Sequence, residues 1–361
     1  MVFGALVVYI IIMYDFSLKL KRESRKKAYC ISVFIAMTLI MGLRSRYTAG
    51  VDTDLVYLPA FNDICKHGFK WTIDNHINKD VVFYVFTKII SLFTHNEQVY
   101  MMIISIIATG SFTLLVYRYS EKPIISFIVY MALGYYTMGF QMLRHIMAVS
   151  ILLFSYPFLR DRRPIPFILV TLFAACFHSS ALIFLIAYPF ATLKLGWKQW
   201  ALLIATVLAV YLVKDSISGL ISKYLSDSER YGTYTESAVS LNLMGMLVLL
   251  CVFITSLAFA DRETKALPEY HILSNMCVLS IAFMALVTVV GEFHRVSMFF
   301  GMFNTLLLPL AFKNVREKRM RAIVIIAMIV LIYYFWCINW KIPASSIFGF
   351  IGRNQNGFLG R

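Results

Sequence analysis

The amino-acid sequence predicts an all-α polytopic integral membrane protein with about 10–12 transmembrane helices, since a crossing takes roughly 20 apolar residues. Hydrophobic residues make up 60% of the 361 residues and charged residues only 15%, whereas a soluble domain is about 45–50% apolar and about 25% charged. The apolar residues form continuous runs, not the alternating segments of an outer-membrane barrel. This composition excludes a soluble enzyme, a disordered chain and a fibrous repeat.

The individual apolar runs give the expected spans. The first run is followed, not preceded, by basic residues and lacks a small-residue cleavage site, so a retained anchor is expected instead of a signal peptide. The expected spans, in chain order, are 2–18, 28–43, 99–116, 123–140, 144–159, 199–213, 240–260, 270–290, 293–312 and 322–338.

The apolar run 165–190 has His178 near its middle, and its length fits one crossing. The basic loop 313–321, however, falls on the inner side only if this run contributes an even number of crossings. We therefore predict a helical hairpin, or a re-entrant pair, with His178 near the outer surface. A single crossing is the alternative.

The formal net charge of +15 reports orientation in this interpretation, because cytoplasmic loops retain Lys and Arg. With the spans above, +13 of this charge falls in loops on one side, which we take as the inner side. These loops are 19–27, 118–122, 160–163, 194–198, 261–269 and 313–321. Such a distribution does not predict a nucleic-acid partner.

One membrane domain is expected over residues 1–361, with two sizeable polar segments on the outer side at 44–98 and 214–239. The run 81–93 inside the first segment is too short to span and predicts an interfacial or re-entrant helix. No Walker motif, glycine-rich nucleotide motif or metal-ligand spacing is present, and the six cysteines form no CxxC pair. We expect no metal, no cofactor and no disulfide framework.

Arginine, histidine and aspartate gather at the outer ends of the expected spans. Arginine clusters bind phosphate or pyrophosphate through bidentate hydrogen bonds, and a carboxylate or imidazole can remove a proton from a hydroxyl. An anion transporter could use the same groups. The candidate site residues are Arg44, Asp52, Asp54, Arg144, His145, His178, Arg230, Tyr231, His294 and Arg295.

Each candidate also has a structural interpretation. Arg44 could extend to the lipid headgroups, and the aspartates beside Gly50 could cap a turn. Arg144 and Arg295 could sit in ion pairs, the latter with Glu292. Tyr231 could belong to an aromatic belt. His178 favours function more strongly, because ionisable groups within membrane spans are rare and usually line a cavity.

Four short motifs carry a family resemblance. They are Gly42-Leu43-Arg44 followed by Gly50-x-Asp52-Thr53-Asp54-x-x-Tyr57, then Leu143-Arg144-x-x-x-Ala148, Phe177-His178-x-Ser180-Ala181-Leu182, and Arg295 ahead of Pro309. In order and placement they resemble the Wzy-type O-antigen and exopolysaccharide polymerases, in the EpsG-like branch. Two positions depart from that pattern: His145 stands where the family often has Gln, and Phe299 where it often has Tyr.

The resemblance implies a GT-C-like, multi-pass glycosyltransferase of the bacterial inner (cytoplasmic) membrane with its active site facing the periplasm. Such an enzyme transfers a growing glycan from an undecaprenyl pyrophosphate carrier onto a lipid-linked repeat unit, in lipopolysaccharide or exopolysaccharide synthesis. Expected partners are the undecaprenyl-pyrophosphate-linked oligosaccharide, membrane lipid and a chain-length regulator protein. An O-antigen ligase and a flippase or anion transporter are the alternatives.

The expected roles follow from the chemistry of that transfer. His178 or Asp52 would accept the proton of the attacking hydroxyl, and His178 is favoured because a neutral imidazole is a competent base near pH 7. Arg44, Arg144 and Arg295 would bind the pyrophosphate and stabilise it as it leaves. The remaining members of the binding set are Asp54, His145, His294, Arg230 and Tyr231.

Overall fold

The computed structural model describes residues 2–45, 50, 52–77, 80–191, 193–194, 212, 243–288 and 291–315. Within these ranges every regular element is a helix, as predicted. The predicted spans 199–213 (apart from Leu212) and 322–338 lie outside the described residues, as does the polar segment 214–239.

The described helices follow the order of the apolar runs. They are α1 (Val2–Ser17), α2 (Arg22–Gly42), the π-helix η2 (Thr53–Tyr57), α3 (Leu58–Lys66), α4 (Phe69–His76), α5 (Val81–Ser91), α6 (Glu97–Tyr119), α7 (Pro123–Ala132), α8 (Tyr135–Met138), α9 (Leu143–Leu152), η3 (Leu153–Ser155), α10 (Tyr156–Arg160), α11 (Pro164–Phe177), η4 (Ser179–Ile186), α12 (Ala187–Ala191), α15 (Leu243–Phe259), α16 (Arg262–Ala266), α17 (Pro268–Ala285), η5 (Leu286–Thr288), α18 (Phe293–Gly301) and α19 (Asn304–Ala311).

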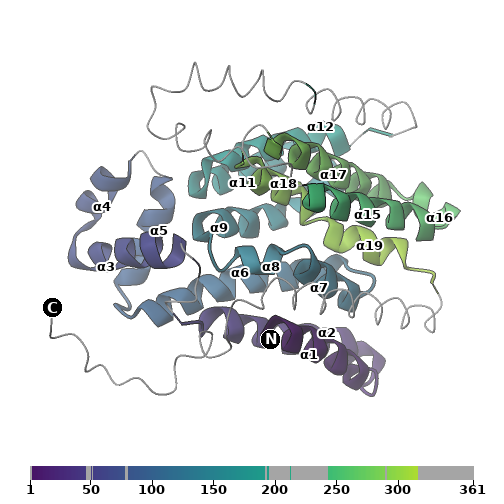
Figure 1. Ribbon diagram of the computed structural model, residues 1–361, viewed down its shortest axis with the longest axis horizontal. Coiled ribbons are helices and arrows are strands. Elements are labelled where there is room, and N and C mark those ends of the chain that lie inside the picture. The colour runs from purple at the N-terminus through teal and green to yellow at the C-terminus, as the bar shows by residue number, and fades with distance from the viewer. Residues whose placement is uncertain are drawn as a thin grey trace.

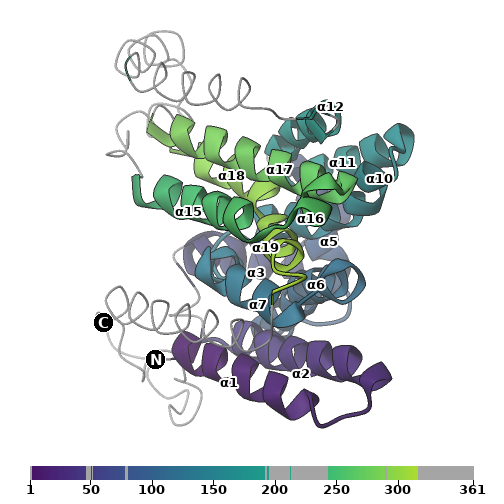
Figure 2. The ribbon, with the colours of Figure 1, turned by 90° about the vertical axis from the view of Figure 1, so that its right-hand side faces the viewer.

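The helices pack in successive layers. Figures 1 and 2 show α1 and α2 along one edge, α6 and α7 above them, and α11, α17 and α18 at the opposite side. Close packing joins α2 to α6, α9 to α11, and α17 to α18. Stacked rings fill the interior, such as those of Phe112 and Tyr130, whose centroids are 3.7 Å apart.

Several expected spans are divided into shorter helices. The run 123–140 breaks between α7 and α8 at Gly134, whose φ of 74° lies in the left-handed region that favours glycine. The run 293–312 is likewise split into α18 and α19. One described helix, α6, is both long and apolar enough to cross a membrane, with shorter apolar helices beside it.

The segment 165–190 forms a hairpin, as the sequence predicts. Helix α11 ends at Phe177, and His178 adopts an extended backbone (φ −156°, ψ 111°) that turns the chain back into η4. At the other end of the hairpin, Arg162 Nη2 donates a hydrogen bond of 3.3 Å to the carbonyl oxygen of Ala191. His178 thus lies at the tip of the hairpin.

Five of the loops predicted for the inner side contact one another through their described residues at one end of the bundle. The contacts are Lys26 Nζ to the Ser120 carbonyl (2.7 Å), Lys122 Nζ to the Val315 carbonyl (3.2 Å), Lys313 to Glu121 (3.2 Å), Asn314 to Asp261 (2.6 Å) and Arg160 to Glu269 (3.7 Å). Helix α16 marks this end on the right of Figure 1. The described parts of these five loops therefore lie together at one end of the bundle.

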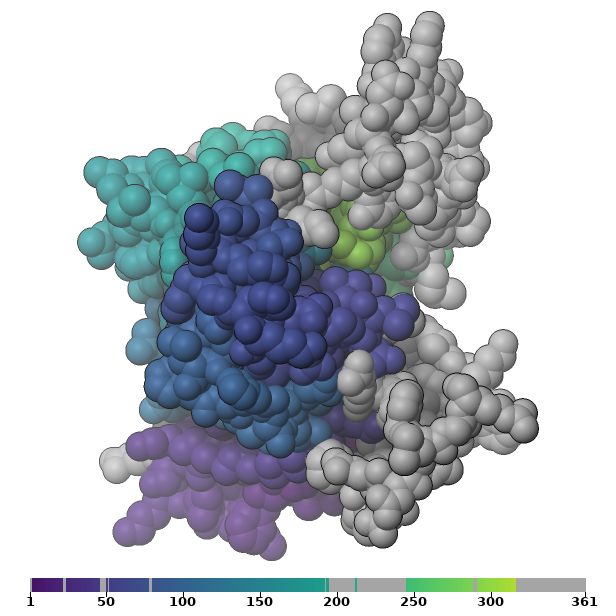
Figure 3. All heavy atoms as spheres, turned by 90° about the vertical axis from the view of Figure 1, so that its left-hand side faces the viewer, coloured from purple at the N-terminus to yellow at the C-terminus, as the bar shows by residue number. Residues whose placement is uncertain are grey.

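The opposite end carries α3, α4 and α5 from the first polar segment (Figure 1). The sequence predicted the short helix at 81–93, found here as α5, but not η2, α3 or α4. Helix α5 packs against α3, α4 and α11. Figure 3 faces this end and shows the blue surface of α3–α5 projecting beside the teal surface of the hairpin, with a yellow-green surface near α18 on the other side.

Candidate active site

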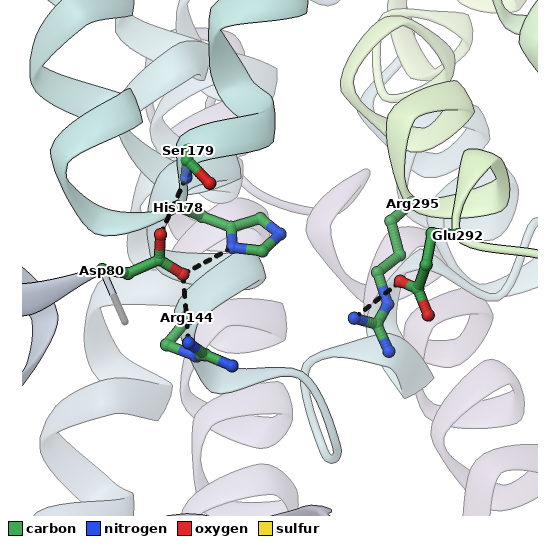
Figure 4. Close-up of polar contacts among 6 residues, drawn as sticks. All are labelled: Asp80, Arg144, His178, Ser179, Glu292 and Arg295. Atoms are coloured by element: carbon green, nitrogen blue, oxygen red, sulfur yellow. Dashed lines mark hydrogen bonds and ion pairs between the residues drawn. The ribbon is translucent and has the colours of Figure 1, made fainter. Parts of the chain in front are cut away.

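Asp80 is the centre of a polar cluster that joins three elements at this end. Its Oδ2 accepts hydrogen bonds from Nη1 of Arg144 (3.1 Å) and from Nδ1 of His178 (3.0 Å), and its Oδ1 accepts one from the Ser179 backbone N–H (3.0 Å). Figure 4 shows the three contacts converging on the carboxylate. The Asp80 side chain is only 7% exposed. These bonds tie the start of α5 to the start of α9 and to the tip of the α11–η4 hairpin.

The backbone of Asp80 is held in an unfavourable conformation. Its φ of 48° and ψ of 53° place it in the left-handed region, immediately before α5. That region costs an L-residue roughly 1–2 kcal/mol, although Asp tolerates it better than most. Strain of this kind persists where surrounding contacts over-determine it, and it is concentrated at functional sites. The three hydrogen bonds to the carboxylate supply such contacts.

The contact with Asp80 fixes which nitrogen of His178 carries the proton in the neutral ring. An ionised carboxylate can only accept, so Nδ1 is the donor and Nε2 keeps its lone pair. The side chain of His178 is 15% exposed. In Figure 4, Nε2 points away from Asp80, toward the side on which Arg295 lies. An imidazole oriented by a carboxylate with its second nitrogen open is the arrangement of a general base.

Arg295 and Glu292 form the facing part of the site at the start of α18. Arg295 Nη1 lies 2.8 Å from Glu292 Oε2. The neighbouring His294 donates from Nδ1 to the carbonyl of Gly291 at 2.7 Å. Helix α18 packs against both η4 and α9, so Arg295 is carried by an element next to the His178 hairpin. Figure 4 shows the Arg295–Glu292 pair across from Asp80, Arg144 and His178.

His145 lies next to His178 and is 2% exposed. Its ring centroid is 5.5 Å from that of His178 and 4.6 Å from that of Phe299. The His145 ring interacts electrostatically with three neighbouring side chains, those of His178, Arg295 and His294. Neither ring nitrogen has a hydrogen-bond partner, although buried polar atoms are nearly always bonded.

Aromatic rings surround the guanidinium of Arg144. Its Cζ lies 5.9 Å from the ring centroid of Tyr57 and 6.0 Å from that of Tyr84. Tyr57 ends η2 and Tyr84 belongs to α5, so two elements of the first polar segment contact the same arginine. Among the described residues, no group of three His, Cys, Asp or Glu side chains could hold a metal ion.

The comparison with protein families agrees with this order of motifs. The EpsG family model matches residues 4–351, nearly the whole chain. The chain belongs to the EpsG family. No curated protein and no solved structure matches it. Membership associates this EpsG-family chain with polymerases of polysaccharide synthesis, which are glycosyltransferase-like enzymes, and suggests a membrane protein.

The structure of this EpsG-family chain brings together five of the residues singled out in the sequence: Arg144, His145, His178, His294 and Arg295. The ion pairs considered for Arg144 and Arg295 are both present. His145 and Phe299, where the sequence departs from the family pattern, are in ring contact.

The other candidates lie elsewhere or outside the described residues. Arg44 contacts the end of α2 and Phe140 instead of the Asp80 cluster. Asp52 precedes η2 without a capping hydrogen bond from its side chain, and Asp54 lies within η2, partly buried. Arg230 and Tyr231 fall outside the described residues.

Asp80, the carboxylate that contacts His178, is not among the residues predicted from the sequence. The available signal is an acidic residue directly before the short apolar helix at 81–93, on the predicted outer side. The sequence favours Asp52 because it lies in a recognisable motif. The motif nevertheless contacts the site region, since Thr53 Oγ1 donates a 2.7 Å hydrogen bond to the carbonyl of Phe140, three residues before Leu143 begins α9.

Gly50 of this motif should not tolerate a side chain. Its φ of 98° is strained for any L-residue, and a Cβ would collide with Gln141. We expect Gly50→Ala to lower the free energy of unfolding by about 1–3 kcal/mol, read as a lower thermal unfolding midpoint in detergent. Gly4→Ala is the matched control, because a Cβ there meets no atom within 4 Å. Equal unfolding midpoints for the two variants would mean that the fold does not require glycine at position 50.

Protonation of Asp80 should loosen the cluster at low pH. Burial raises the pKa of its carboxyl, but hydrogen bonds from His178 and Ser179 and the charges of His178 and Arg144 outweigh burial and lower the pKa below its ordinary value. A carboxyl with a lower pKa in the folded chain stabilises the fold above its unfolded pKa of about 3.9, and this stabilisation is lost as the pH falls through the folded pKa.

We therefore expect the difference in unfolding midpoint between the wild type and Asp80→Asn to be full at pH 7 and to shrink below about pH 4. Thermal unfolding in detergent at a series of pH values measures it. Asp63→Asn, at an exposed position of α3, is the control. A difference that stays constant down to pH 3 would mean that the charge of Asp80 does not stabilise the fold.

Proposed function

We propose that this chain is a polysaccharide polymerase of the bacterial inner membrane. It transfers a growing glycan from an undecaprenyl pyrophosphate carrier onto a lipid-linked repeat unit at the periplasmic face. The observation that supports this best is the His178 imidazole, oriented by Asp80 and flanked by Arg144 and, on α18, by Arg295. A base and cationic groups at one end of a helical bundle suit group transfer from a pyrophosphate donor.

The proposed reaction uses His178 as the base. The acceptor hydroxyl oxygen attacks the anomeric carbon of the donor sugar, and the hydroxyl proton passes to Nε2 of His178. The bond between the anomeric carbon and the pyrophosphate oxygen breaks, and its electron pair leaves with the pyrophosphate. Proton removal by a positioned base contributes about 10²–10⁴ to the rate.

Arg144 and Arg295 stabilise the leaving pyrophosphate in this proposal. Each is engaged by a carboxylate, Asp80 or Glu292, but each also has a buried Nε without a partner. A guanidinium carries five N–H donors, so it can keep its ion pair and still donate to phosphate oxygens. Donors placed where negative charge develops are often the largest contribution to catalysis.

The orientation in the membrane follows from the division of charge. The basic loops lie at the end opposite the site, and cytoplasmic loops are those that retain Lys and Arg. The site then faces the periplasm, where the lipid-linked oligosaccharide is its substrate. A chain-length regulator protein stays a proposed partner.

The test is polymerisation by the purified chain supplied with lipid-linked repeat units, followed as a glycan ladder on a gel. A ladder formed in detergent, without a membrane gradient, supports the polymerase and excludes a flippase or anion transporter. A deletion strain separates the polymerase from an O-antigen ligase. Single-repeat glycan on the lipid core indicates a polymerase, whereas polymer left on its carrier indicates a ligase.

A further inference from the structure

Arg44 is a buried cation with unused hydrogen-bond donors. Its side chain follows α2 and is 2% exposed. Nη1 donates a hydrogen bond of 2.9 Å to the carbonyl of Met41, but Nε and Nη2 have no partner. Among the described residues, no carboxylate forms an ion pair with it.

The surroundings of Arg44 compensate its charge only in part. The carbonyl of Met41 lies at the negative end of the α2 dipole, which favours a nearby cation. The guanidinium carbon is also 5.0 Å from the ring centroid of Phe140, and a desolvated cation–π contact is attractive. Removing a cation from water costs more free energy than such contacts return, and unpaired N–H groups add to that cost.

The charge of Arg44 nevertheless persists at neutral pH. Burial lowers the pKa of Arg44 to about 10, which still leaves the guanidinium protonated at pH 7. The position is also fixed before any ligand arrives. Gln98 of α6 donates from its amide to the carbonyl of Gly42 and, at 3.4 Å, to that of Arg44 itself. A fixed guanidinium with two free donors is a preorganised anion site.

The contacts of Arg44 differ from those of the reacting groups. Its side chain contacts the end of α2 and Phe140, whereas Arg144 contacts Asp80, Tyr57 and Tyr84. No described histidine or carboxylate that could transfer a proton contacts Arg44. An anion bound there would be held without being activated.

We propose that Arg44 forms a second anion site, which binds a phosphate group of a prenyl pyrophosphate other than the one held at Arg144 and Arg295. This inference rests on the proposed function, in which both substrates are lipid-linked. The donor loses its pyrophosphate during transfer, but the acceptor keeps its own, so the enzyme must hold two such groups at once. Arg44 suits the acceptor, because no described group next to it would help the pyrophosphate to leave the sugar.

The number of prenyl pyrophosphates bound tests the proposal without requiring activity. Farnesyl pyrophosphate titrated into the detergent-purified chain should bind at two equivalents, measured by calorimetry. Arg44→Gln and the Arg144→Gln/Arg295→Gln double variant should each keep one equivalent, and the triple variant none. Arg44→Lys, which keeps the charge, should retain two, as should Arg160→Gln at the opposite end. One equivalent in the wild type, or two in Arg44→Gln, would overturn the proposal.

A competition arm separates the substrate from bulk lipid as the source of the phosphate. Phosphatidylglycerol added to the micelles should leave the Arg44-dependent equivalent bound. If phosphatidylglycerol at equal concentration displaces it, Arg44 holds a lipid headgroup and the acceptor assignment is wrong. Thermal unfolding of Arg44→Gln shows whether the variant is folded, and Arg44→Lys supplies the folded comparison if it is not.

A kinetic arm assigns the site to the acceptor. Arg44→Gln should raise the KM for a lipid-linked acceptor about tenfold, since a charge-assisted hydrogen bond contributes about 1.5–3 kcal/mol, with little change in kcat. A phosphate-free oligosaccharide acceptor should react equally with both forms. Equal losses with both acceptors would overturn the assignment. Failure of the wild type to polymerise would count against the proposed function alone, because the binding stoichiometry is measured separately.

Discussion

His178→Ala should lower the rate of polymer formation by about 10²–10⁴, the contribution expected of a general base. The imidazole receives the hydroxyl proton in the proposed reaction, and alanine has no group that can take it. Its Nδ1 is held at 3.0 Å from Asp80, so the open Nε2 is preorganised before the substrate binds. The initial rate of ladder formation by purified protein at saturating donor measures the loss.

The variant should remain folded, which makes the loss interpretable. Asp80 keeps its hydrogen bonds to Arg144 and to the backbone of Ser179 when the imidazole is removed. His95→Ala is the matched control, since this histidine is exposed in the loop between α5 and α6 and should leave the rate unchanged. A wild-type rate in His178→Ala would place the base elsewhere, with Asp52 as the remaining candidate.

The position of His178 could be predicted because it depends on the whole pattern of the chain. The basic loop 313–321 must lie on the same side as the other basic loops, so the run 165–190 must cross an even number of times. That places its midpoint at the outer tip. The structure confirms the hairpin through the turn at His178 and the closing contact of Arg162 with Ala191.

The partner of His178 could not be predicted in the same way. Asp80 is 98 positions away in the sequence, and the contact depends on how α5 packs against α11. The helices α3 and α4, which support α5, carry no long apolar run that would mark them. Periodicity identifies elements that cross the bundle, whereas the placement of short helices in a polar segment is decided by tertiary contacts.

The breaks inside the spans were missed for a related reason. The run 123–140 is apolar throughout, so composition predicts one helix, but Gly134 takes a positive φ and ends α7. The composition of the run 293–312 likewise predicts a single helix, but the structure has two helices there, α18 and α19. Apolar content predicts that a segment is buried or faces lipid, and it says little about where the segment bends.

Asp80→Asn should lower the rate of polymerisation by about two orders of magnitude or more, although Asp80 touches no substrate in the proposed reaction. Asparagine has the same size and tolerates the left-handed backbone at this position, so α5 should stay in place. Its amide can donate a hydrogen bond to Nδ1, which moves the ring proton to Nε2 and removes the lone pair that the reaction needs. In the serine protease triad, the same change costs about 10⁴ in kcat.

The division of the loss between kcat and KM separates positioning of His178 from a purely structural role. Loss of the lone pair on Nε2 should lower kcat and leave the KM for the acceptor unchanged, because the lone pair is needed only in the reaction step. A displaced α5 or hairpin would instead raise the KM as well. Asp80→Ala should lose the rate and also lower the unfolding midpoint, because a partly buried Arg144 then lacks its partner. If Asp80→Asn keeps both the wild-type kcat and the wild-type KM, Asp80 serves only to attach α5 to the bundle, and His178 must be oriented by the substrate itself.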